Sequence, residues 1–194
     1  MEDSNAPETG RSGETRAEED GSEENGCYKN RVEEDRPKDT GQADAEAVKL
    51  RIAWIGKTRS PAIQSLTAEY LKRLSQYAAC DAMEFASEAA LLKQVEKSAG
   101  RTQPVLVLLD SRGRQLASEE IANFLEYQLS HDTQDLLFAV GSADGWTDAT
   151  RAKAQHVLSF GKITLPHELA RVVLLEQLYR GFTILKGHPY HQGH

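Results

Sequence analysis

The C-terminal tail holds a cluster of side chains that could carry chemistry. His188, Tyr190, His191 and His194 all lie within residues 188–194. The three histidines have His-x-x-His-x-x-His spacing, which could hold a metal ion, but no cysteine or carboxylate accompanies them. We therefore expect no metal here, and a polar chain end is the plainer interpretation of the histidines.

Two arginines precede this tail inside a strongly apolar segment. Arg171 and Arg180 lie on a predicted helix that runs from Leu169 to Leu185. An arginine on such a helix is either held by a structural partner or kept available for a phosphate of a substrate. We expect a functional role for Arg180 and a structural one for Arg171.

A short glycine-bearing segment follows one of the most apolar stretches of the chain. Gly141-Ser142-Ala143-Asp144-Gly145 comes directly after a predicted buried strand, residues 135–141. Ligands of open parallel sheets bind at the carboxyl ends of strands, and glycine lets the backbone approach them closely. The segment has no GxGxxG pattern and no phosphate-loop lysine, so a plain tight turn is the alternative.

A second loop of this kind lies later in the chain, over residues 158–167 (LSFGKITLPH). A strand ends there, Gly161 and Lys162 follow, and Pro166 leads into the terminal helix. Taken alone, a simple connection is the favoured interpretation. His167, at the helix start, is expected to cap or pack rather than to catalyse, and it is only a weak candidate for the site.

Strands and helices alternate from Val48 onward, which predicts a parallel α/β sheet covered on both faces. Pro104–Asp110 and the later stretch 135–141 are continuous apolar runs, typical of strands buried on two sides. Arg112-Gly113 is expected to turn the chain, and Ser118 to cap the following helix. The other predicted strands cover residues 50–55, 82–86 and 156–160, and the other helices begin at Pro61, near Leu91 and near Thr147.

The terminal helix carries more apolar surface than one sheet can cover. Its apolar positions extend beyond the single stripe of a surface helix. The surplus indicates a second partner, and another copy of the chain is the most economical one. We therefore expect a homodimer. The apolar positions are residues 169, 172, 173, 174, 175, 178, 179, 182, 184 and 185.

Charge is distributed unevenly along the 194 residues. The net charge of −7 combines −9 over residues 1–46 with +2 over the remainder, so the predicted folded part is mildly basic. Few large apolar groups occur in residues 1–47, and we expect an acidic disordered extension there, followed by one domain over 48–194. The chain shows no signal peptide or membrane span, and Cys27 and Cys80 form no disulfide framework, so a cytoplasmic protein is expected.

The C-terminal sequence LPHELARVVLLEQLYRGFTI…HPYH resembles the RlmH family, SPOUT-class methyltransferases that modify a pseudouridine of large-subunit (23S) ribosomal RNA. The resemblance begins at VKLRIAWIGK, extends to His191, and implies a SPOUT fold with a C-terminal trefoil knot. Chains of this family typically open with Met-Lys at that point. Either Val48 is the true start, from a GTG codon, or residues 1–47 are a genuine extension.

The resemblance also implies an S-adenosylmethionine site built from three strand ends. The expected cofactor-binding residues are Leu109, Gly141, Phe160, Gly161, Lys162, Ile163, Thr164 and Leu165. Family members usually have Gly-Gly-x-x-Gly where this chain has a serine, Ser142, as second residue. If that position needs a positive φ, serine costs about 1 kcal/mol there, and cofactor affinity is lowered.

For catalysis the resemblance implies Arg180, Tyr190 and His191, on a tail that folds over the active site of the other subunit. Tyr190 would stack on the target base, His191 or solvent would accept the N3 proton, and Arg180 would favour the anion. The implied substrate is ribosomal RNA in the assembled ribosome. Methylation of tRNA, as in other SPOUT enzymes, and a catalytically silent RNA-binding module are the alternatives.

Overall fold

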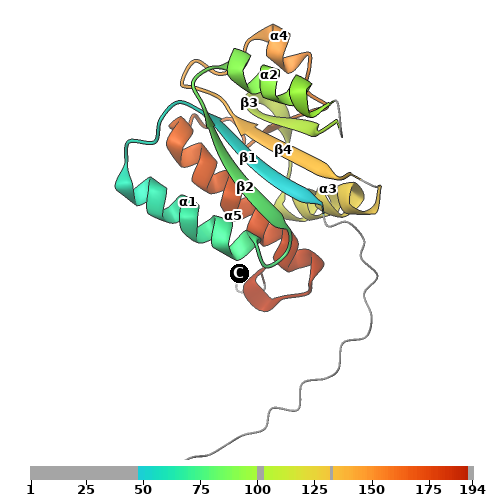
Figure 1. Ribbon diagram of the computed structural model, residues 1–194. Helices are drawn as coiled ribbons and strands as arrows, with labels where there is room; N and C mark the ends of the chain where they lie inside the picture. Colours follow the sequence, from blue (N-terminus) through green and yellow to red (C-terminus); the bar gives the residue numbers. More distant parts are fainter. Residues whose placement is uncertain (1–47, 100–102, 132, 192–194) are drawn as a thin grey trace, which may run out of the picture. The chain divides into compact units, whose positions relative to one another are not determined.

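The computed structural model describes residues 48–99, 103–131 and 133–191, and of His191 only the backbone (Figure 1). The predicted extension, residues 1–47, lies outside these ranges, as does His194. Within the ranges described, no helix is long and apolar enough to cross a membrane.

Five parallel strands form the sheet, in the order β2-β1-β4-β3-β5. The central strands are apolar on both sides, because Leu136, Phe138 and Val140 of β4 face one core while Leu137 and Ala139 face the other. This arrangement confirms the predicted α/β sheet. The strands are β1 Lys49–Ile55, β2 Ala79–Phe85, β3 Val105–Gln115, β4 Asp135–Val140 and β5 His156–Ser159.

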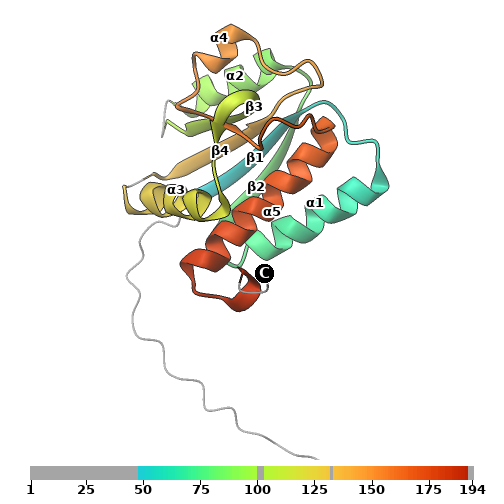
Figure 2. The ribbon, with the colours of Figure 1, turned by 180° about the vertical axis from the view of Figure 1, so that it is seen from behind.

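Helices cover both faces of the sheet (Figure 1). The larger core lies under α1, α3 and α5, where Leu74, Leu125 and Leu175 are each at most 1% exposed. Figure 2 shows these three helices on the same side of the sheet. The helices are α1 Pro61–Leu74, α2 Glu88–Ser98, α3 Ser118–Ser130, α4 Asp148–Arg151 and α5 His167–Leu185, and the 3-10 turn η1 spans Pro189–His191.

The prediction of a turn at Arg112-Gly113 is wrong. Strand β3 continues to Gln115 and pairs with β5 twice, with a register shift between Leu109 and Arg114. The two backbones cross so closely that a Cβ on Gly113 would lie 2.5 Å from the carbonyl carbon of Leu158. Glycine is therefore needed for this approach rather than for a reversal. The trefoil knot implied by the resemblance stays a prediction.

The start of α3 also differs from expectation. Ala117 occupies the N-cap position, and its backbone N–H donates to the Glu120 carboxylate at 2.8 Å. Ser118 is already helical, and its hydroxyl donates instead to the side-chain oxygen of Gln177 on α5, at 2.8 Å. This bond joins α3 to α5, so the serine connects two helices and does not cap one.

Candidate active site

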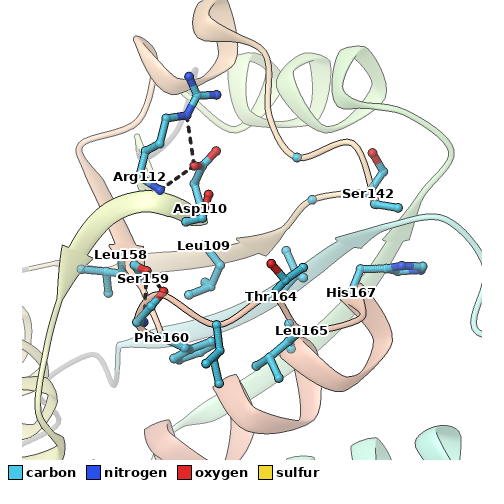
Figure 3. A pocket seen from close by; sticks show the side chains of 18 of the residues that line it. Leu109, Asp110, Arg112, Ser142, Leu158, Ser159, Phe160, Thr164, Leu165 and His167 are labelled. Atoms are coloured by element: carbon cyan, nitrogen blue, oxygen red, sulfur yellow. Dashed lines mark hydrogen bonds and ion pairs between the residues drawn. The ribbon is translucent and has the colours of Figure 1, made fainter.

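A cavity of about 250 Å³ opens at the carboxyl ends of β4 and β5 and beside the middle of β3, where the pairing of β3 with β5 shifts register (Figure 3). Apolar side chains and the backbone of two glycine-bearing turns make up most of its wall. The first residues of α5 close one side. The lining residues are Leu109, Asp110, Ser111, Arg112, Val140, Gly141, Ser142, Ala143, Asp144, Gly145, Leu158, Ser159, Phe160, Gly161, Ile163, Thr164, Leu165, His167 and Ala170.

Seven of the eight predicted cofactor residues line this cavity: Leu109, Gly141, Phe160, Gly161, Ile163, Thr164 and Leu165. Lys162 is the exception, because its exposed side chain is not part of the wall. The structure thus brings together three segments that are separate in sequence, from the middle of β3 and from the ends of β4 and β5. Ile163 is 68% exposed at this site, which leaves a large apolar group available to a ligand or a partner.

The turn after β4 is fixed to the middle of β3 by a buried tryptophan. Trp146 is 3% exposed, and its indole Nε1 donates to the carbonyl of Leu109 at 2.9 Å. A Cβ on Gly141 would lie 3.1 Å from the Trp146 ring, so glycine lets the ring close on the backbone. Two walls of the cavity are held in register by this one side chain.

Ser142 fits into this turn as part of a small bridge. It pairs with Gly145 in an antiparallel bridge, and the Gly145 N–H donates to the Ser142 carbonyl at 3.0 Å. The glycine that takes a positive φ here is Gly145, at 74°. Ser142 lines the cavity, and its hydroxyl is a further polar group that could contact a ligand (Figure 3).

The turn after β5 is organised by a serine hydroxyl. Ser159 Oγ donates to the carbonyl of Gly161 at 3.1 Å and accepts from the Gly161 N–H at 3.2 Å. Gly161 has a φ of 105°, a conformation that L side chains rarely adopt. The backbone from Phe160 to Leu165 therefore runs along the cavity as an irregular segment whose polar groups are available to a ligand.

An acidic side chain in the middle of β3 was not predicted as part of the site. The carboxylate of Asp110 lines the cavity, is 4% exposed, and accepts from the Arg112 backbone N–H at 2.9 Å and from Arg151 Nη1 at 3.0 Å. Burial alone would raise the pKa of Asp110, but these hydrogen bonds and the two arginine charges outweigh it and lower the pKa. The group is therefore ionised at neutral pH. In the sequence, Asp110 directly follows the apolar run 104–109, and this position could have marked it as a site residue.

His167 and Ala170 bring α5 to the cavity, and two further lining residues, Ser111 and Arg112, come from the unexpected extension of β3. The histidine lies at the first helical position after Pro166, at the edge of the cavity in Figure 3. His167 therefore lines the cavity, but no catalytic step is assigned to it.

Two of the three predicted catalytic residues, Arg180 and Tyr190, lie together but away from the cavity, and the side chain of His191 lies outside the described part. Arg180 forms an ion pair with Glu176 at 2.9 Å and lies 5.3 Å from the ring centre of Tyr190. The hydrogen bond with Glu176 raises the pKa of Arg180, and burial raises the pKa of Tyr190. Along α5, Arg180 is about 15 Å beyond the cavity-lining Ala170. One copy of the chain therefore does not bring this pair to its own cavity.

Arg171 is 1% exposed and packs over the ring of Trp54. Its guanidinium lies 4.1 Å from the ring centre of Trp54, and Nη1 donates to Thr58 Oγ1 at 2.8 Å. Burial lowers the pKa of Arg171, and its Nε and Nη2 have no hydrogen-bond partner among the residues described. These contacts agree with a structural role, although the partners are a ring and a hydroxyl rather than a carboxylate.

The parts of the chain covered by the structure contain no group of three or more His, Cys, Asp or Glu placed to hold a metal ion. His188 makes a local contact instead, because its Nδ1 accepts from the Tyr190 N–H at 3.2 Å. The side chain of His191 and the whole of His194 lie outside the part described, so the His-x-x-His-x-x-His alternative falls largely outside the described residues.

Comparison with known proteins connects this geometry to an enzyme family. The model of a family described as "Predicted SPOUT methyltransferase" matches residues 48–191. A protein of Koribacter versatilis named Ribosomal RNA large subunit methyltransferase H is 63% identical over 147 residues, which covers 76% of this chain and 100% of that protein. The protein of the same name from Gloeobacter violaceus is 42% identical over 154 residues, covering 75% and 100% of the two chains.

One solved structure supports the fold independently of close sequence similarity. It is a probable methylase family protein from Haemophilus influenzae Rd KW20, 12% identical, with a TM-score of 0.50 over 73% of this chain and 70% of that one. At this identity the likeness shows the fold alone. Together with the family match over the whole described sheet and its helices, it shows that the chain is an enzyme that belongs to the SPOUT methyltransferase family.

Proposed function

We propose that this chain transfers a methyl group from S-adenosylmethionine to N3 of a pseudouridine in large-subunit ribosomal RNA, with the assembled ribosome as substrate. The observation that carries the proposal is the convergence of seven predicted cofactor residues on one cavity. The names of the relatives, Ribosomal RNA large subunit methyltransferase H, support the RNA substrate. An enzyme acting on ribosomes would work in the cytoplasm.

The cavity wall fits such a cofactor. Leu109, Phe160 and Leu165 offer apolar surface for a planar ring, and the glycine-bearing turns expose backbone donors and acceptors for polar groups. The carboxylate of Asp110 in the wall forms ion pairs with Arg151 at 3.0 Å and with Arg112 at 3.5 Å, so it adds no unpaired negative charge to the site. When bound, S-adenosylmethionine would supply a methyl group already activated by its positively charged sulfur.

The protein's own task is then to align the base and to handle one proton. The N3–H of the base must lose its proton as the new N–C bond forms. His191 or solvent would accept that proton, and Arg180 would stabilise the developing negative charge. Holding the base nitrogen in line with the methyl group supplies a large part of the rate enhancement without a metal ion.

A homodimer would bring the separated groups together. Arg180 and Tyr190 lie about 15 Å along α5 from the cavity of their own chain, so a second copy is the simplest source of the residues that complete each site. Surplus apolar surface supports such a contact: Leu169 is 39% exposed, and Ile163 at the cavity is also exposed. The dimer would place the tail of one copy over the cofactor of the other.

The deciding experiment is transfer of labelled methyl from S-adenosylmethionine to purified ribosomes, separated subunits, naked ribosomal RNA and bulk tRNA. Label on intact ribosomes alone, mapped to N3 of a pseudouridine, is the expected result. Label on tRNA would overturn the substrate, and absence of transfer by a dimer that still binds the cofactor would favour a silent RNA-binding module. Replacing Arg180 by alanine should abolish transfer, whereas the same change at Lys186, an exposed cation beyond the end of α5, should not.

A further inference from the structure

The loop between β1 and α1 carries two exposed cations, Lys57 and Arg59, beside the cavity. Its position follows from the sheet, because Trp54 near the end of β1 is in register with the cavity-lining Val140 of β4. It is also tied to α5, where Glu168 comes directly after the cavity-lining His167. The loop therefore borders the opening through which a large substrate would approach.

The acidic side chains near this loop accept hydrogen bonds from its backbone. Glu84 accepts from the Thr58 N–H at 3.3 Å, and Glu168 accepts from the Arg59 N–H at 2.8 Å. The backbone hydrogen bond from Arg59 lowers the pKa of Glu168, which stays ionised. Among the described residues, neither Lys57 nor Arg59 forms an ion pair.

The loop is held in one conformation by bonds from three sides. Besides the two carboxylates, Arg171 donates to Thr58 Oγ1 at 2.8 Å and Gln64 Nε2 donates to the Thr58 carbonyl at 3.2 Å. At the end of β1, the Gly56 N–H donates to the Phe85 carbonyl at 2.9 Å. A fixed backbone loses little freedom on binding, so the two charges are preorganised for a partner.

Several other exposed cations of the sheet and helices do form ion pairs. Lys49 pairs with Asp81 at 2.6 Å, Arg114 with Glu120 at 3.3 Å, and Lys153 with Glu96 at 3.0 Å. Near the cavity, Lys162 is a third exposed cation that forms no ion pair within the described chain, on the turn after β5. Cations without partners therefore occur on two loops that border the same opening.

We propose that Lys57 and Arg59 contact backbone phosphates of the RNA beside the target nucleotide, with Lys162 as a third contact across the cavity. The inference rests on the proposed function and names residues that position its substrate. Phosphate contacts fix the register of a protein on RNA without reading its sequence. They also release counterions, so each one steepens the dependence of binding on salt.

The test is a titration of the full chain on ribosomes by co-sedimentation at several salt concentrations. Each lost contact should reduce the slope of log affinity against log salt by about 0.7 to 0.9. For the double variant Lys57→Ala/Arg59→Ala the slope should therefore be about 1.4 to 1.8 less steep. If the affinities of variant and wild type are equal at 1 M salt, the variant should bind about 25- to 60-fold more weakly at 0.1 M salt. The affinity for S-adenosylmethionine should not change.

The matched control is Lys93→Ala/Lys97→Ala, which removes the same charge from α2. Both lysines are exposed, and neither forms an ion pair in the regions described. This control should keep the wild-type slope. Equal slopes for wild type and the loop variant would overturn the phosphate contacts, and equal losses in both double variants would show a general charge effect instead. Because the readout is binding, it is separate from the methyl-transfer assay, whose failure would concern the proposed function.

Discussion

Replacing Trp146 by phenylalanine tests whether one buried side chain holds two walls of the cavity together. The change keeps an aromatic ring against Gly141 but removes the donor that bonds to the Leu109 carbonyl at 2.9 Å. Trp146 is 3% exposed, so water cannot readily replace the bond. A buried polar group left without its partner costs about 1–3 kcal/mol, and we expect the free energy of unfolding to fall by that amount.

Urea denaturation measures this loss directly. With a slope of about 2 kcal/mol per molar urea, the midpoint should fall by about 0.5–1.5 M. The affinity for S-adenosylmethionine, measured by calorimetry, should fall with it, because the turn from Gly141 to Gly145 loses its attachment to β3. The change in affinity distinguishes a loosened site from a general loss of stability.

Trp54→Phe is the matched control. Its indole Nε1 also donates a hydrogen bond, to Glu84 at 3.2 Å, but this bond is exposed to solvent and water can replace it. The loss of stability should stay below about 1 kcal/mol, and cofactor affinity should not change. Equal midpoints and equal affinities for the two variants would refute the reasoning that Trp146 fixes the site.

Three further outcomes are expected. The pKa of Asp110 is lowered in the folded state, so its carboxylate stabilises the fold fully at pH 7, above the unfolded pKa of about 3.9. This stabilisation is lost as the pH falls through the folded pKa. The difference in urea midpoint between wild type and Asp110→Asn should therefore shrink between pH 7 and pH 3. Gly113→Ala should lower the thermal midpoint much more than Gly187→Ala does. An added methyl at Gly113 would meet the backbone of β5 at 2.5 Å. Gly187, at a φ of 63°, has nothing within 4 Å of an added methyl, so its replacement should cost only the backbone strain of about 1 kcal/mol. Arg171→Met should be nearly neutral or stabilising in urea, since an apolar side chain avoids burying an incompletely bonded charge, and a loss above about 3 kcal/mol would contradict this.

The cavity could be predicted because its walls follow from local patterns. Continuous apolar runs such as 135–140 indicate buried parallel strands, and the carboxyl ends of such strands share one edge of the sheet. The glycines at 141 and 161 mark where each strand stops. These patterns place the strand ends at one edge of the sheet, whereas the assignment of Leu109, Gly141 and Phe160 to a cofactor site came from the resemblance to the family.

The extension of β3 could not be predicted in this way. Arg112-Gly113 has the composition of a turn, and only the pairing of Arg114 with Leu158 of β5 makes it a strand. Likewise, the hydroxyl of Ser118 bonds to Gln177, a residue that the local sequence around α3 does not contain. Contacts between distant segments decide both features, and local propensity carries no information about them.

The double pairing of β3 with β5 has a consequence for motion. An edge strand ordinarily frays first, and its amide hydrogens exchange quickly with solvent. Here β5 is paired before and after the register shift, and Gly113 crosses directly over Leu158. The strand cannot leave unless the outer part of β3 lifts with it. We therefore expect the β5 amides and those of Arg114 and Gln115 to exchange together, as one cooperative opening of the methyl-donor site.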